Sequence, residues 1–121
     1  MNTLDRLKKE IADTPIILYM KGSPERPQCG FSARAVQALH ACGAKFISVD
    51  VLSEPEVRQV LPEVANWPTF PQLFVKGELI GGSDIILEMQ ANGELQQLIN
   101  EVQQHYNQNL ANNPMHQSFT C

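Results

Sequence analysis

The sequence lacks the features that mark several classes of protein. It has no apolar run near the roughly 20 residues that a membrane-spanning helix needs, and its first residues lack the apolar segment of a secretory signal. Its three cysteines, at positions 29, 42 and 121, are too few and too irregularly spaced for a disulfide framework. A net charge of −4 disfavours nucleic-acid binding, which depends on a basic surface. We therefore expect a cytoplasmic protein that binds neither membranes nor nucleic acid.

Composition favours one folded domain followed by a tail. With 43% hydrophobic and 18% charged residues among 121, the chain has the composition of a globular protein with a single core. From Gln103 onward it has no Asp, Glu, Lys or Arg and is rich in Asn and Gln. Such a segment has too little apolar surface to offset the entropy lost on ordering. We expect a domain over residues 1–106 and a flexible polar tail over residues 107–121.

The spacing of apolar residues predicts the order helix, strand, helix, strand, helix, strand, strand, helix, helix. Compact apolar or alternating runs place the strands at residues 16–20, 46–51, 72–75 and 78–80. Polar residues suited to N-caps place three helix starts at Thr3, Ser53 and Ser83, with Ser53 and Glu56 forming a capping-box pattern. Gly43 is suited to ending the second helix.

This order of elements predicts the fold class. The first strand–helix–strand unit supplies a parallel pair of strands, and the hairpin over residues 72–80 adds two antiparallel strands. The result is a four-stranded mixed sheet flanked by helices. We therefore expect an α/β protein with a thioredoxin-like fold.

Cys29 is the strongest candidate for a functional residue. It lies where a Pro-rich loop leads into the second helix. Free backbone N–H groups and the helix dipole stabilise a thiolate there, and Lys21 adds positive charge. A thiolate can act as a nucleophile or as a metal ligand, although the position could also hold an inert small residue. Ser32 stands one helical turn later, where a second cysteine would resolve a mixed disulfide, so no local dithiol chemistry is possible.

The thiols of one chain are too few for an iron–sulfur cluster, which usually takes four thiolates. Cys42 shares an apolar stripe with Val36 and Leu39, so we interpret it as a core thiol. Cys121 ends the polar tail and has no assigned role. The three histidines are interpreted as surface residues: His40, His105 and His116. A cluster would therefore need a second subunit and an external thiol.

Four segments together resemble the CGFS-type monothiol glutaredoxins of the single-domain bacterial class. The resemblance covers residues 3–106. The segments occur in the family's order and spacing: Lys21-Gly22-Ser23-Pro24, Cys29-Gly30-Phe31-Ser32, Trp67-Pro68-Thr69-Phe70-Pro71-Gln72-Leu73, and Gly81-Gly82 followed by Asp84. The seven residues between Lys21 and Cys29 resemble the longer loop of this class.

The resemblance implies a glutathione site beside Cys29. Residues matching Lys21 and Arg58 hold the glycyl carboxylate in this family, although Arg58 by itself reads as a solvated side chain. The segment with Phe70 resembles a cis-proline turn whose backbone pairs with the peptide, the alternative being a plain connector. Ser83 and Asp84 would bind the γ-glutamyl group at a helix start, the alternative being an ordinary serine cap. Many relatives have cysteine in place of Ser83.

The resemblance also implies a cargo and partners. Two subunits, each with Cys29 and one glutathione, hold a bridging [2Fe–2S] cluster in this family. The expected protein is thus a homodimer when loaded, serving iron–sulfur cluster storage, transfer and biogenesis, with apo iron–sulfur proteins as recipients and BolA-type proteins as partners. The alternative is a glutathione-dependent oxidoreductase that deglutathionylates proteins through Cys29. A third possibility is a redox-sensing adaptor.

Overall fold

The computed structural model describes the backbone of residues 2–111 and the side chains of residues 2–104. The elements follow the predicted order: α1 (Thr3–Asp13), β1 (Ile16–Met20), α2 (Gly30–Ala41), β2 (Ile47–Asp50), α3 (Pro55–Ala65), β3 (Gln72–Val75), β4 (Glu78–Gly81), α4 (Ser83–Ala91) and α5 (Glu94–Ala111). None of the helices in this described part is long and apolar enough to cross a membrane.

The four strands form one mixed sheet in the order β2-β1-β3-β4, as predicted. β1 pairs in parallel with β2, and the β3–β4 hairpin adds to the other side of β1 in antiparallel fashion. The helix between the parallel strands is α2, which is why the end of β1 and the start of α2 lie at the same edge of the sheet.

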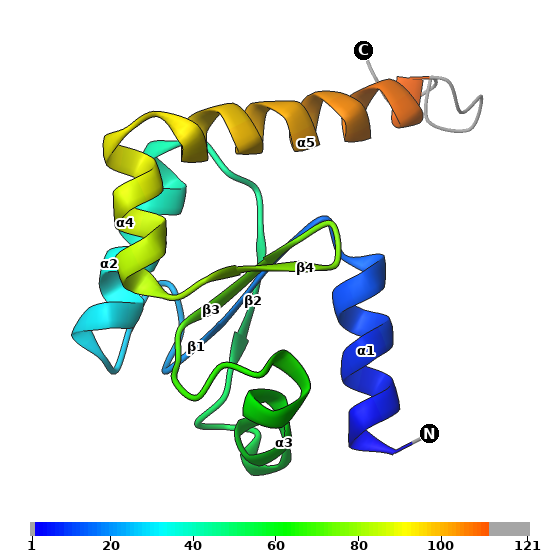
Figure 1. Cartoon of the computed structure of the whole chain (residues 1–121), viewed down its shortest axis with the longest axis vertical. Coiled ribbons are helices and arrows are strands. Elements are labelled where there is room, and N and C mark those ends of the chain that lie inside the picture. Colours follow the sequence, from blue (N-terminus) through cyan, green and yellow to red (C-terminus); the bar gives the residue numbers. More distant parts are fainter. Residues whose placement is uncertain (1, 112–121) are drawn as a thin grey trace.

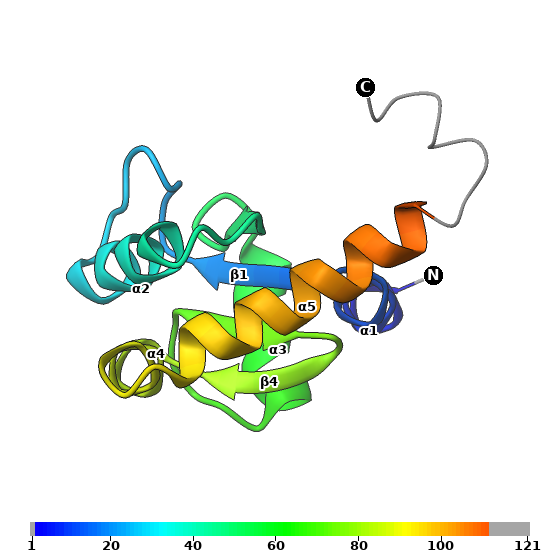
Figure 2. The same cartoon turned by 90° about the horizontal axis from the view of Figure 1, so that it is seen from above.

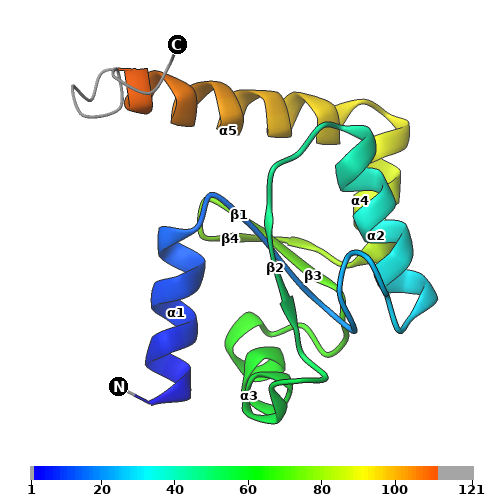
Figure 3. The ribbon, with the colours of Figure 1, turned by 180° about the vertical axis from the view of Figure 1, so that it is seen from behind.

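Helices cover both faces of the sheet (Figures 1 and 2). Because side chains alternate along a strand, Ile16, Leu18 and Met20 of β1 pack with α2, α4 and α5, while Ile17 and Tyr19 pack with α1 and α3. The view from behind shows α2 beside α4 on one side and α1 beside α3 on the other (Figure 3). Burial on both faces explains why β1 is apolar at every position.

All three predicted N-caps were wrong: Thr3 at α1, Ser53 at α3 and Ser83 at α4, where the N-cap is Gly82. α1 begins after Asn2, whose side chain accepts a backbone N–H of the first turn at 2.9 Å, while the Thr3 hydroxyl donates to Glu56 at 2.7 Å. The residue before α3 is Glu54. Ser53 does not cap α3, because its hydroxyl donates to the Asp50 carboxylate at 3.0 Å. An ionised acceptor nearby forms the stronger hydrogen bond and prevents the capping box.

The last helix extends beyond the expected domain boundary. α5 continues to Ala111, so residues 107–111 of the expected tail are helical, and residues 112–121 lie outside the described residues. Helical hydrogen bonds are local and need no apolar surface. Side chains nearer its start hold α5 against the α2–β2 connection: Gln96 donates to the Cys42 carbonyl at 3.0 Å, and Gln103 accepts the Lys45 N–H at 2.7 Å.

Candidate functional site

Cys29 is the N-cap residue of α2, as its position in the sequence predicted. Its backbone is extended and its side chain makes no capping hydrogen bond, so the thiol is free to face outward. The residue is partly exposed, whereas Cys42, the C-cap residue of the same helix, is only 7% exposed. A reagent or ligand can therefore reach the thiol of Cys29.

The surroundings of Cys29 favour the thiolate. The backbone N–H of Ser32 is the main group that lowers the pKa of the Cys29 thiol, opposed by partial desolvation. The N–H of Phe31, the charge of Lys21 and the Ser32 hydroxyl lower the pKa further. The two N–H groups are free donors at the start of the helix, as expected from the sequence. Burial raises the pKa of the Cys42 thiol, so the cysteines at the two ends of α2 have pKa values shifted in opposite directions.

We expect Cys29 to react with iodoacetamide at lower pH than an ordinary cysteine. Because the thiolate is the nucleophile and the pKa of Cys29 is lowered in the folded chain, its alkylation rate should reach half of its plateau at a lower pH than in the urea-unfolded chain. In the folded chain, buried Cys42 should react slowly at every pH. Mass spectrometry of each cysteine-containing peptide separates the rates. Identical profiles for Cys29 in the folded and unfolded chain would contradict this prediction.

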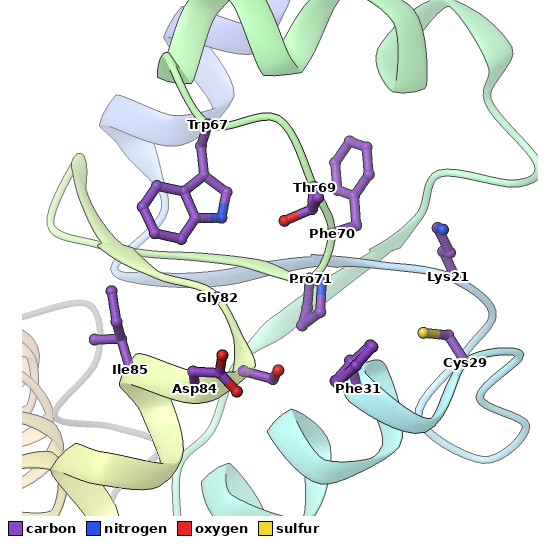
Figure 4. Close-up of a pocket in the computed structure, with 11 residues that line it drawn as sticks. Lys21, Cys29, Phe31, Trp67, Thr69, Phe70, Pro71, Gly82, Asp84 and Ile85 are labelled. Carbon is purple, nitrogen blue, oxygen red and sulfur yellow. The ribbon is translucent and has the colours of Figure 1, made fainter.

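A groove of about 530 Å³ lies beside Cys29. Cys29 and Lys21 are at one end and Trp67, Asp84 and Ile85 at the other (Figure 4). The groove is bounded by the end of β1, the start of α2, the α3–β3 connection and the start of α4. The lining residues are Lys21, Cys29, Phe31, Trp67, Thr69, Phe70, Pro71, Gly82, Ser83, Asp84 and Ile85.

The connection between α3 and β3 forms one side of the groove. The Phe70–Pro71 peptide bond is cis, as the resemblance implied. The buried amide of Gln72 donates to the carbonyls of Trp67 and Thr69 at 2.9 and 3.2 Å, which holds the turn against the sheet. The backbone of Phe70 is thereby kept beside the groove, in reach of a peptide ligand.

The start of α4 closes the far end of the groove. The N-cap is Gly82 and not Ser83, which is the first helical residue and is 8% exposed, so the predicted cap was wrong by one position. A Cβ atom on Gly82 would lie 3.3 Å from both the Pro71 carbonyl oxygen and the Trp67 indole nitrogen, so glycine allows this close approach without displacing either neighbour. Ser83 and Asp84 thus place helix-start N–H groups and a carboxylate at the groove.

The groove contains all but one of the residues expected at the site. Cys29 shares it with four of the five expected glutathione-binding residues: Lys21, Phe70, Ser83 and Asp84. Arg58 is exposed near the start of α3 and is not among the lining residues. Phe31 and Trp67 also line the groove but were not expected as site residues, although both lie within the motifs that carry the resemblance.

The described side chains provide one accessible thiol, that of Cys29, and no cluster of metal ligands. Within this part of the chain, no group of three or more His, Cys, Asp or Glu residues could hold a metal ion. Cys42 is about 20 Å from Cys29 along α2, given the helical rise per residue. His40 is exposed beside the Phe46 ring, as expected for a surface residue. His105, His116 and Cys121 lie outside the described side chains.

A partly exposed, activated thiol at the start of α2, facing a cis-proline turn on a four-stranded mixed sheet, defines a protein of the thioredoxin-like fold. The glutaredoxin family model matches residues 16–80. Glutaredoxin 4 of Escherichia coli (strain K12) is 60% identical over 104 residues, which cover 86% of this chain and 90% of that protein. The chain belongs to the glutaredoxin family, and its similarity to glutaredoxin 4 confirms the expected single-domain monothiol class.

Solved structures support the same fold. The solution structure of reduced poplar apo GrxS14 matches with a TM-score of 0.70 at 42% sequence identity, over 82% of this chain and 91% of that chain. The crystal structure of a buckwheat glutaredoxin–glutathione complex matches with a TM-score of 0.71 at 22% identity, over 82% of this chain and 88% of that chain. At that identity, the buckwheat protein bears on the fold alone. The predicted thioredoxin-like fold is confirmed.

Proposed function

We propose that this glutaredoxin binds glutathione beside Cys29 and carries a [2Fe–2S] cluster between two copies of the chain, for storage or transfer to apo iron–sulfur proteins. The observation that carries the proposal is the activated thiol of Cys29, at one end of a groove with a positive charge and a helix start.

The polar groups of the groove complement those of glutathione. Glutathione has a carboxylate at each end, an ammonium group beside one of them, and a thiol in the middle. Lys21, at the Cys29 end, would hold the glycyl carboxylate, and Arg58 would reach it from outside the lining. At the other end, N–H groups near Ser83 would bind the γ-glutamyl carboxylate and Asp84 its ammonium. The backbone of Phe70 would pair with the peptide between them.

The donor set suits a cluster that is shared between chains. One chain contributes the Cys29 thiolate, and a glutathione in the groove contributes a second thiolate, so two copies supply the four that such a cluster usually takes. Ser32 supports this use, because no neighbouring thiol competes for Cys29 by forming a disulfide. BolA-type proteins are proposed as partners, and the cytoplasmic location and the redox-sensing role remain predictions.

The proposal is tested by anaerobic reconstitution of the full chain with iron, sulfide and glutathione. We expect the visible absorption bands of a [2Fe–2S] centre, elution as a dimer, and loss of both when glutathione is omitted. The control is the same mixture with its glutathione replaced by dithiothreitol. A colourless monomer in every mixture would refute cluster binding.

A second candidate function is glutathione-dependent reduction of glutathionylated proteins. It is favoured by the lowered pKa of the Cys29 thiol, which suits a nucleophile. The Cys29 thiolate would attack the glutathione sulfur of the mixed disulfide and release the protein thiolate, and a second glutathione thiolate would then release Cys29 and leave as glutathione disulfide. Rapid turnover of a glutathionylated substrate by a chain that binds no cluster would favour this function.

A further inference from the structure

Asp50, at the end of β2, joins two segments at the base of the long loop. One of its carboxylate oxygens, Oδ1, accepts the backbone N–H groups of Gly22 and Leu52, both at 2.9 Å. The other, Oδ2, accepts the Ser53 hydroxyl at 3.0 Å. Only the bond to Gly22 is distant in sequence. It ties the loop that begins after β1 to the connection that leads into α3.

The Gly22 bond completes a set of anchors on both sides of Lys21. The Lys21 N–H donates to the Ser32 hydroxyl of α2 at 3.1 Å, and the Lys21 carbonyl accepts the Gln28 N–H at 2.9 Å. With the Gly22 N–H on Asp50, the backbone around Lys21 is held by α2, by the far end of the loop and by the end of β2. The base of the Lys21 side chain, which lines the groove, is therefore fixed.

The other two hydrogen bonds of Asp50 hold the segment that precedes Arg58. Leu52 and Ser53 belong to the short connection before α3, and Arg58 lies in the early part of that helix, its N–H bonded to the Glu54 carbonyl at 3.1 Å. One carboxylate thus bonds to the segment before Arg58 and to the residue that follows Lys21. These two cations are the ones proposed for the same carboxylate of glutathione.

We propose that Asp50 is a positioning residue that sets the spacing of Lys21 and Arg58 for the glycyl carboxylate of glutathione. The inference rests on the proposed glutathione site. Without the carboxylate, the loop loses its Gly22 anchor, while the Val51 N–H still donates to the Met20 carbonyl at 2.9 Å and holds the end of β1 beside β2. The backbone that follows Lys21 can then shift relative to the connection before α3, and the two cations converge less well on one anion. The effect is confined to the glycyl end, because the γ-glutamyl end is bound by α4.

The test compares the affinities of Asp50→Ala and wild type for two ligands, measured by NMR titration. These are reduced glutathione and its glycinamide analogue, which lacks the glycyl carboxylate. We expect Asp50→Ala to bind glutathione roughly five- to tenfold more weakly, the effect of one or two misplaced charged contacts, and to bind the analogue as wild type does. Asp50→Asn keeps an oxygen acceptor for Gly22 and Leu52, so its affinity should stay within about twofold of wild type.

Asp13→Ala is the control for the change in charge, because Asp13 is exposed and pairs with Lys9 at 3.1 Å, away from the groove. Its affinities should equal those of wild type. Equal losses for both ligands in Asp50→Ala, or no loss for either, would overturn the role of Asp50 while leaving the glutathione site intact. Absence of glutathione binding by wild type would instead refute the proposed function, and this inference with it.

The wild-type chain offers a second measurement that does not depend on the folding of Asp50→Ala. The Gly22 amide proton should exchange with solvent at least about 100-fold more slowly than in an unstructured peptide, because its hydrogen bond must open first. The same amide in Asp50→Asn should remain protected. Exchange of the Gly22 amide near the unstructured rate in wild type would overturn the anchor.

Discussion

Cys29→Ser is expected to abolish the glutathione-dependent [2Fe–2S] absorption and the loaded dimer completely. Serine has no thiolate, and each chain contributes the accessible thiol of Cys29 to the proposed cluster. The fold should be retained or slightly stabilised, by about 0.5–1 kcal/mol, because Cys29 is an N-cap residue without a capping bond and serine is a favoured cap. Reconstitution followed by absorption spectroscopy, size-exclusion chromatography and thermal unfolding measures all three effects.

Cys42→Ser is the matched control for this prediction. The thiol of Cys42 is buried at the other end of α2, and burying a hydroxyl there should lower the free energy of unfolding by about 1–2 kcal/mol. Cluster loading should nevertheless equal that of wild type. Cys29→Ser should therefore lose the cluster and keep its stability, whereas Cys42→Ser should keep the cluster and lose stability. A loaded cluster in Cys29→Ser, or its loss in a folded Cys42→Ser chain, would contradict the assignment of Cys29 as the ligand.

Gly22→Ala is expected to lower the free energy of unfolding by about 3 kcal/mol, a large effect for one methyl group. Gly22 has a positive φ of 90°, and a Cβ atom there would lie 2.5 Å from the Arg26 carbonyl oxygen and 2.7 Å from the Gln28 nitrogen. Both neighbours are backbone atoms of the same loop, so the loop must move to admit the methyl group. Urea denaturation, followed by the fluorescence of the single tryptophan, Trp67, measures the change.

Gly30→Ala provides the comparison for Gly22→Ala. Gly30 begins α2 with no positive φ, and nothing lies within 4 Å of its added Cβ. Alanine there should leave stability within about 1 kcal/mol of wild type, because it also favours the helix. If Gly22→Ala had the same urea midpoint as Gly30→Ala, the close packing at the base of the loop would be disproved.

The N-caps show how far local patterns could predict the structure. A polar residue before an apolar repeat predicted that a helix starts near Thr3, Ser53 and Ser83, and in each case it does. Which side chain becomes the cap depends on competing partners in space. The Ser53 hydroxyl bonds to Asp50 and is not used as a cap. At α4 the N-cap is Gly82, which approaches Trp67 and Pro71 from a segment separated from them in sequence.

The sequence by itself determined the order of elements, the mixed sheet and the place of Cys29 at a helix start, because these depend on apolar periodicity and on local Gly and Pro signals. It carried the resemblance that named Lys21, Phe70, Ser83 and Asp84. Only the tertiary structure decided that these residues line one groove, that Arg58 lies outside its lining, and that Asp50 anchors the loop. Which residues meet at one groove, and which hydrogen-bond partner a side chain takes, depend on distances between segments far apart in the chain. No local sequence pattern contains those distances.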